Sequence, residues 1–169
     1  YPPQDLLLDD TFIQKAHKAL EDIAASVNTT PVIVGTIRQE NDKLFNTAAV
    51  IQDGSVIAFR DKTHLPTYDV FDEVRYFTPA ESIKPVELRM NRDAVKLGLQ
   101  ICEDLWDEEY NLKVCQVLCE KGAELLINIS SSPFHIGKLK ERTDIISSKA
   151  KNLKCYFIYC NLVGAQDEL

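Results

Sequence analysis

The sequence has 169 residues, of which 45% are hydrophobic and 27% charged, and its formal net charge is −7. This length and composition predict a single globular domain over residues 1–169 with a substantial core. The acidic balance leaves no basic stripe that could neutralise phosphates. No apolar run approaches the about 20 residues that a membrane helix needs. We therefore expect neither a nucleic-acid partner nor a membrane partner.

The cysteines are odd in number and form no C-x-x-C pair. They are Cys102, Cys115, Cys119, Cys155 and Cys160. This pattern argues against a disulfide framework or a zinc site and favours a reducing, cytoplasmic location. The only methionine is Met90, and the sequence opens in mid-phrase with "YPPQDLLL". We interpret the sequence as a fragment of a longer protein.

The first half predicts a helix followed by a small sheet. A helix is expected over residues 9–27, where apolar side chains recur at helical spacing. Three strands are expected next, over residues 31–37, 44–52 and 55–62. Asp53-Gly54 is a strong hairpin signal, and this hairpin would make the sheet mixed. Residues 63–79 are irregular and rich in aromatic and charged side chains, which favours a functional loop.

The second half interleaves strands with helices. Strands are expected over residues 94–102, 124–130 and 155–164. Helices are expected over residues 112–123, where Gly122 marks the end, and 140–153. This order predicts a layered α/β domain and not a regular βαβ ladder.

Cys102 lies where the predicted strand of "LGLQICEDLW" ends, and ligands of α/β sheets bind at such strand ends. A helical turn starting at Glu103 or Asp104 would direct backbone N–H groups at the sulfur, which stabilises a thiolate and forms an oxyanion hole. The two carboxylates have the opposite effect on the thiol, because negative neighbours raise its pKa. The alternative is a small core residue, which is also our interpretation of the other four cysteines.

A second candidate set lies between residues 62 and 77. The Lys62 ammonium could supply the positive charge that Cys102 lacks, although lysines at strand ends are usually solvated. Glu73 could hold this ammonium, or it could pair with Arg75 on the surface. His64 could instead be the base of a Cys-His hydrolase, but a solvated or structurally bonded histidine is commoner. The aromatic side chains, Tyr68 among them, could wall a pocket or only pack the loop.

A third candidate set lies in "SSSPFHIGK", which follows a predicted strand. Ser132 could hydrogen-bond an amine or a carboxylate, and Lys138 could pair with a carboxylate. The alternative is a serine turn with an exposed lysine.

Four segments together carry a family resemblance. They are "DKTHLPTYDVFDEVRYFTP", "ICEDLW", "INISSSPFHIGK" and the ending "NLVGAQDEL". The set closely resembles the glutaminase, or amidase, domain of glutamine-dependent NAD synthetases, within the nitrilase or carbon–nitrogen hydrolase superfamily. The resemblance implies an α/β fold, a nitrilase-like αββα sandwich with mixed sheets, here lacking its N-terminal strand.

The resemblance also implies roles for individual residues. Cys102 matches the nucleophile that attacks the glutamine amide, and Lys62 matches the lysine that stabilises the tetrahedral intermediate. Glu73 matches the glutamate that orients this lysine. The substrate-binding positions implied are Tyr68, Glu103, Ser132 and Lys138. Some relatives carry arginine at the last position, so Lys138 would make a single contact where arginine makes two.

The resemblance further implies partners and cofactors. The amidase half would need no metal or organic cofactor. Ammonia would pass to a synthetase domain of the same parent chain, which uses ATP and Mg to amidate nicotinic acid adenine dinucleotide to NAD. A homo-oligomer is also implied. The family's catalytic glutamate would lie upstream of Tyr1, and general-base help is worth about 10²–10⁴ in rate. We therefore expect these 169 residues alone to be impaired as a glutaminase.

Two other functions remain open from the sequence beside the Cys-His hydrolase. One is another nitrilase-branch amidase that acts on a different small amide or nitrile. The other is a non-catalytic scaffold domain. A glutamine-mimicking electrophile would separate enzyme from scaffold, because only a competent site would modify Cys102 ahead of the other cysteines.

Overall fold

The computed structural model describes residues 3–90 and 93–164. The chain divides into two compact units, Tyr1–Glu81 and Ser82–Leu169. Each unit combines one sheet with helices, and each is described here by itself. The expectation of a mixed α/β fold with two sheets is confirmed.

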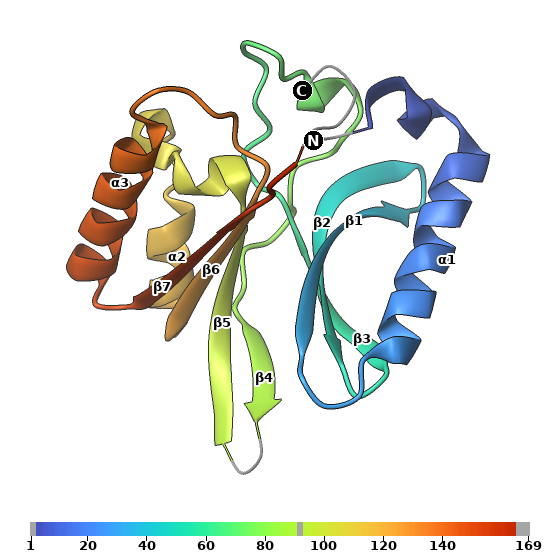
Figure 1. Ribbon diagram of the computed structural model, residues 1–169, viewed down its shortest axis with the longest axis horizontal. Helices are drawn as coiled ribbons and strands as arrows, with labels where there is room; N and C mark the ends of the chain where they lie inside the picture. Colours follow the sequence, from blue (N-terminus) through green and yellow to red (C-terminus); the bar gives the residue numbers. More distant parts are fainter. Residues whose placement is uncertain (1–2, 91–92, 165–169) are drawn as a thin grey trace. The chain divides into compact units, whose positions relative to one another are not determined.

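The first unit is an antiparallel sheet with one long helix (Figure 1). Its elements are a 3₁₀ turn at Gln4–Leu8, α1 (Asp10–Ser26), β1 (Val32–Glu40), β2 (Lys43–Gln52) and β3 (Ser55–Asp61). The strand order is β1-β2-β3, and both pairings are antiparallel. The Asp53-Gly54 hairpin therefore does not make this sheet mixed, because both of its strands and β1 follow one another through short turns.

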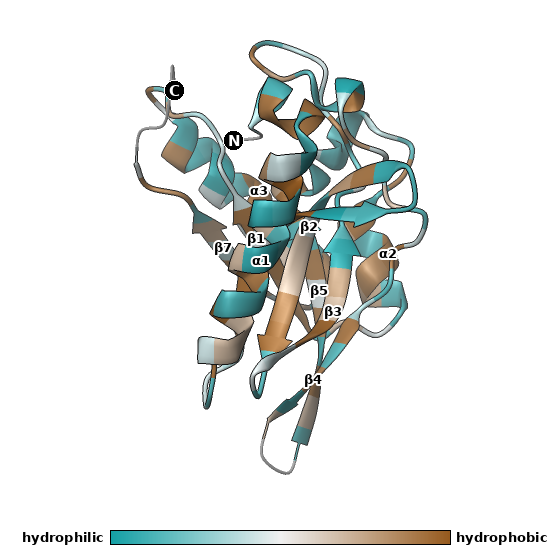
Figure 2. Cartoon of the chain, turned by 90° about the vertical axis from the view of Figure 1, so that its right-hand side faces the viewer, coloured by the Kyte–Doolittle hydropathy of each residue, from teal (hydrophilic) through white to brown (hydrophobic). Residues whose placement is uncertain are grey.

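Helix α1 begins as the sequence predicts, since the Asp9 side chain accepts a hydrogen bond from Thr11 N at 2.8 Å. Figure 2 shows hydrophilic and hydrophobic residues along this helix, as an amphipathic pattern requires. The hydrophobic ones meet the sheet in a core cluster made of Leu20, Ala24, Val27, Ala49 and Ile51. This cluster joins the helix to β2.

The second unit contains the mixed sheet. Its strands are β4 (Val86–Met90), β5 (Asp93–Ile101), β6 (Leu125–Ser130) and β7 (Tyr156–Asn161), in the order β4-β5-β6-β7. β4 and β5 pair antiparallel, whereas β5, β6 and β7 run parallel. β4, which is five residues long, was not predicted from the sequence. The mixed character of the sheet comes from the antiparallel pairing of β4 with β5.

Helices α2 (Val114–Glu120) and α3 (Lys138–Leu153) pack on one face of that sheet. The buried cluster beneath them includes Leu105, Leu118 and Leu126. Gly98 of β5 is required by this packing, since a Cβ there would lie 2.5 Å from Leu126 Cδ2 and 3.3 Å from Leu118 Cβ. Because β5 and β6 are parallel, their carboxyl ends lie at one edge of the sheet, where Cys102 and the loop after Ser130 follow.

No helix within the described ranges is both long and apolar enough to cross a membrane.

Candidate active site

Cys102 is the first residue of a sharp turn at the carboxyl end of β5. The 3₁₀ turn spans Cys102–Leu105, and the φ angle of Cys102 is 44°, in the left-handed region. A residue with a Cβ adopts this region at a cost of about 1–2 kcal/mol. Nucleophilic side chains are often carried on strained strand-to-helix turns of this kind, because the turn lifts the side chain clear of the sheet. The Cys102 side chain is only partly buried.

Two buried polar side chains bond to the backbone on either side of this turn. Asp104 Oδ2 accepts a hydrogen bond from Ile101 N at 3.2 Å. From β6, Asn128 Nδ2 donates to Cys102 O at 3.2 Å. Both side chains are fully buried. The turn is therefore held by one hydrogen bond to its own strand, β5, and by one from the neighbouring strand, β6.

Glu103 is buried and belongs to the same turn. Its Oε1 accepts a hydrogen bond from the Tyr110 hydroxyl at 3.1 Å, and its carbonyl accepts from Trp106 N at 2.9 Å. The predicted helical turn beside the sulfur is present, in 3₁₀ form. It contains both of the acidic residues that follow Cys102, Glu103 and Asp104.

The loop after β6 carries Ser132, which is buried. Its backbone N–H donates to Asn161 Oδ1 at 3.0 Å, and its carbonyl accepts from Arg142 NH2 at 2.9 Å. These bonds connect the loop to the end of β7 and to α3. The position of Ser132 is thus set by hydrogen bonds of its own backbone.

Lys138, the first residue of α3, lies over Trp106, the residue that follows the Cys102 turn. Its Nζ is 3.8 Å from the centroid of the Trp106 ring, within the range of a cation–π interaction. The same nitrogen is 3.0 Å from Glu141 Oε2. Gly137 precedes it with a φ of 91°, a conformation that favours glycine. The structure therefore brings Lys138, predicted to bind a carboxylate, to the residue that ends the "ICEDLW" segment.

In the first unit, Lys62 and Glu73 form a buried ion pair. Lys62 directly follows β3, and its Nζ lies 2.5 Å from Glu73 Oε1. The side chains are only 2% and 3% exposed. Asn46 Nδ2 donates to the other carboxylate oxygen of Glu73 at 3.1 Å. Glu73 does not pair with Arg75, which lies 3.6 Å from Asp5.

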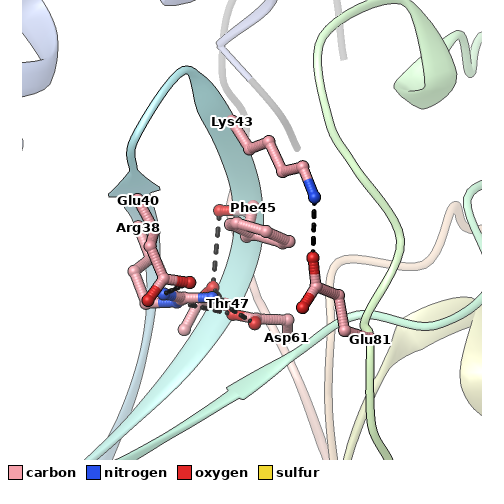
Figure 3. A network of polar contacts seen from close by, with 7 residues as sticks. All are labelled: Arg38, Glu40, Lys43, Phe45, Thr47, Asp61 and Glu81. Carbon is pink, nitrogen blue, oxygen red and sulfur yellow. Dashed lines mark hydrogen bonds and ion pairs between the residues drawn. The ribbon is translucent and has the colours of Figure 1, made fainter.

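A polar network fixes the residue before Lys62 (Figure 3). Asp61 accepts two hydrogen bonds from Arg38, at 3.0 and 2.6 Å, and one from Thr47 Oγ1 at 2.5 Å. Arg38 also lies over the Phe45 ring at 4.3 Å. The bond to Asp61 raises the pKa of Arg38 above its ordinary value. The last residue of β3 is thus tied to β1 and β2, and this sets the direction in which Lys62 leaves the sheet.

The remaining candidates of the first unit differ in exposure. Tyr68 is exposed and packs edge-on against Phe71, with ring centroids 6.0 Å apart. His64 is buried, so the expectation of a solvated histidine is wrong and that of a structurally bonded one fits. The loop that holds them contains one short 3₁₀ turn, Glu73–Arg75.

The other cysteines differ among themselves. Burial raises the pKa of Cys115 to about 12, and its thiol donates to Gln100 Oε1 at 3.4 Å. The sulfurs of Cys119 and Cys155 are 2.8 Å apart. Cys160 is exposed on β7, so the core interpretation is wrong for this residue. Among residues 3–90 and 93–164, no group of three or more His, Cys, Asp or Glu side chains forms a metal site.

The side chains that could carry chemistry were predicted from the sequence, but the residues that bond to them were not. These residues are Asn46, which bonds to Glu73, and Asn128, which bonds to the Cys102 carbonyl. Asn128 did leave a signal, because it is the one polar residue inside the apolar run "LLINI" of β6. Asn46 had no comparable signal.

Each unit offers one chemical group: the second unit a thiol on a strained turn, and the first unit a buried ammonium held by a carboxylate. Residues 12–169 match the family model described as carbon-nitrogen hydrolase. Two similar relatives are glutamine-dependent NAD(+) synthetases of Thermotoga maritima, 37% identical, and Aquifex aeolicus, 39% identical. Both alignments cover 100% of this chain but only 28% and 29% of the relatives.

Solved structures give the same result. A glutamine-dependent NAD+ synthetase from Acinetobacter baumannii matches 99% of this chain, and 30% of its own, with a TM-score of 0.86 and 31% identity. A carbon-nitrogen hydrolase from Helicobacter pylori matches 92% of this chain and 53% of its own, with a TM-score of 0.70 and 26% identity. These likenesses confirm the resemblance and the nitrilase-like fold class that the motifs indicated. The chain belongs to the carbon–nitrogen hydrolase family.

Proposed function

We propose that this chain is the glutamine-hydrolysing domain of a glutamine-dependent NAD synthetase. The observation that carries the proposal is the similarity, along the whole chain, to enzymes of that name. The Cys102 turn and the Lys62–Glu73 pair support it, because amide hydrolysis through a thioester needs a nucleophilic sulfur and a group that stabilises an oxyanion.

In this mechanism the Cys102 thiolate attacks the side-chain amide carbon of glutamine. The ammonium of Lys62 and the backbone N–H of Glu103 stabilise the oxyanion of the tetrahedral intermediate. Glu73 orients Lys62. The intermediate collapses as the amide nitrogen takes up the proton that the thiol released and leaves as ammonia, and a thioester remains. Water then hydrolyses the thioester to glutamate and restores the thiol.

Three side chains would hold the substrate in place. Lys138 pairs with the glutamine carboxylate, which takes the position next to its ammonium that Glu141 occupies. Ser132 hydrogen-bonds the backbone end of the substrate, and Tyr68 covers it. A lysine makes one strong contact with a carboxylate where an arginine would make two.

The ammonia would serve a synthetase domain of the same protein, which uses ATP and Mg to amidate nicotinic acid adenine dinucleotide. The glutaminase reaction itself requires no metal or organic cofactor. A cytoplasmic location and a homo-oligomer belong to this proposal. No residue among the 169 is assigned as general base, and slow glutamine hydrolysis by this stretch alone remains a prediction that a glutaminase assay would check.

The test compares two nitrogen sources in the full-length protein. Cys102→Ala should abolish NAD synthesis from glutamine and leave synthesis from ammonium salts intact. Lys62→Ala should do the same, whereas His64→Ala should retain glutamine-dependent synthesis. A Cys-His hydrolase would give the reverse order for the last two variants. Loss of neither activity in Cys102→Ala would overturn the proposal.

A panel of small amides and nitriles separates this function from that of another amidase of the family. We expect thioester formation at Cys102 from glutamine and not from amides that lack the α-carboxylate. Faster turnover of such an amide would favour the other branch.

A further inference from the structure

We infer that Asn128 is a positioning residue that holds the nucleophile turn in its strained conformation, an inference that rests on the function proposed above. It acts through the backbone of Cys102 and touches neither the sulfur nor the substrate. The evidence lies entirely within the second unit.

The first step is the contact itself. Asn128 Nδ2 donates to Cys102 O at 3.2 Å, and this carbonyl belongs to the residue whose φ angle is 44°. A strained residue persists only where its surroundings fix it. A change in the φ angle of Cys102 turns the rest of the residue, including its carbonyl, about the N–Cα bond, so release of the strain would displace the acceptor of this hydrogen bond.

The second step is the cost of the side chain. Asn128 is 0% exposed, and its Oδ1 has no hydrogen-bond partner among the residues that the structure describes. A buried amide oxygen without a donor is destabilising by about 1–3 kcal/mol, whereas an apolar side chain of similar size would avoid this cost. The amide therefore adds nothing to core stability that a leucine could not supply. Its one hydrogen bond to the nucleophile turn is the contribution that a leucine lacks.

The third step is a matched neighbour. Gln100 is the register partner of Asn128 on β5, and it is equally buried. Its amide also has an atom, Nε2, without a partner in the described part of the chain, and its Oε1 accepts from Cys115 and not from the turn. The two side chains are equally buried, lie in the same sheet and carry the same amide group. They differ in that only Asn128 bonds to Cys102, so Gln100 is the control for general packing effects.

The experiment compares Asn128→Leu with Gln100→Met in the full-length protein. We expect Asn128→Leu to lower kcat for glutamine hydrolysis about 10- to 100-fold with KM changed less than about twofold, because a nucleophile displaced by about 1 Å loses rate and not substrate affinity. Gln100→Met should retain both parameters. Equal losses in the two variants, or an unchanged kcat in Asn128→Leu, would overturn the inference.

A second measurement does not depend on glutamine. Iodoacetamide alkylation of Cys102 should slow in Asn128→Leu relative to the exposed Cys160, which is an internal reference in the same molecule. A wild-type protein that does not hydrolyse glutamine would overturn the proposed function. The ratio of the alkylation rates of Cys102 and Cys160 would still test the positioning role, and an unchanged ratio in Asn128→Leu would overturn it. If Asn128→Leu does not fold, Asn128→Ser is used, since its shorter side chain cannot reach Cys102 O and the same losses are expected.

Discussion

The ammonium nitrogen of Lys62 lies 2.5 Å from Glu73 Oε1, and both side chains are almost completely removed from solvent. Replacement of Glu73 by glutamine keeps the shape of the pair and removes one charge. We expect the free energy of unfolding to fall by about 3 kcal/mol, because a buried ammonium loses its counter-ion. Denaturant unfolding of the variant measures this loss.

The matched control for that variant is Glu81→Gln. Glu81 pairs with Lys43 at 2.7 Å, but both side chains are exposed. Surface pairs of this kind are screened by water and salt, so no measurable change in stability is expected. Equal effects of the two substitutions would show that burial of the Lys62–Glu73 pair has no energetic importance.

The φ angle of Cys102 leads to a second prediction, in which glycine is better than alanine. Cys102→Gly should be more stable than Cys102→Ala by about 1 kcal/mol, because glycine adopts the left-handed region without a Cβ clash. At Cys115, which lies inside α2, the alanine variant should instead be more stable than the glycine variant by about 1 kcal/mol, because glycine is unfavourable within a helix. Thermal unfolding of the four variants gives both differences. Alanine equal to glycine at residue 102 would contradict the strained turn.

Much of this fold could be read from patterns along the chain. The helix and hairpin of the first unit follow from apolar periodicity and from Asp53-Gly54, and their bounds differ from the expected ones by a few residues. β4 escaped because a five-residue strand with exposed positions has little periodicity. The sheet that contains the hairpin proved antiparallel, because strand direction depends on which strand pairs next, and that is a tertiary property.

The site could be predicted only in part. Residue types that carry chemistry, such as Cys102 and Lys62, stand out in a sequence because of their position at strand ends. The residues that support them, such as Asn128 and Asn46, are recognised by a contact between distant strands. The left-handed φ of Cys102 likewise has no signature in residue type, since glycine is the usual occupant of that region.

Lys138 gives a third prediction, about substrate affinity. Lys138→Ala should raise the KM for glutamine tenfold or more with a small change in kcat, because a charge-assisted hydrogen bond to the carboxylate is worth about 1.5–3 kcal/mol. Lys140→Ala is the control, since Lys140 lies on the same helix and pairs with Asp144 in solvent. It should leave KM unchanged. Steady-state kinetics of the two variants would contradict the binding role if both KM values matched the wild type.

The fourth prediction concerns Cys119 and Cys155, whose sulfurs lie 2.8 Å apart. Oxidised glutathione should convert the two thiols to a disulfide and release two molecules of reduced glutathione. Burial and the hydrogen bond with Cys155 raise the pKa of Cys119 to about 12, so its thiolate is scarce at pH 8. Attack by Cys119 should therefore accelerate about tenfold for each pH unit between 8 and 10. Mass spectrometry of digested protein detects the product.

The cross-link should also stabilise the fold. It closes a loop of 36 residues, which constrains the unfolded chain by about 2–4 kcal/mol. The melting temperature should rise on oxidation of the wild type and return on reduction, while Cys155→Ala should show neither change. Cys160, exposed on β7, should form only a mixed disulfide with glutathione because no second thiol lies against it in the described part of the chain. A wild type that gains glutathione at Cys160 but no Cys119–Cys155 link would contradict the prediction.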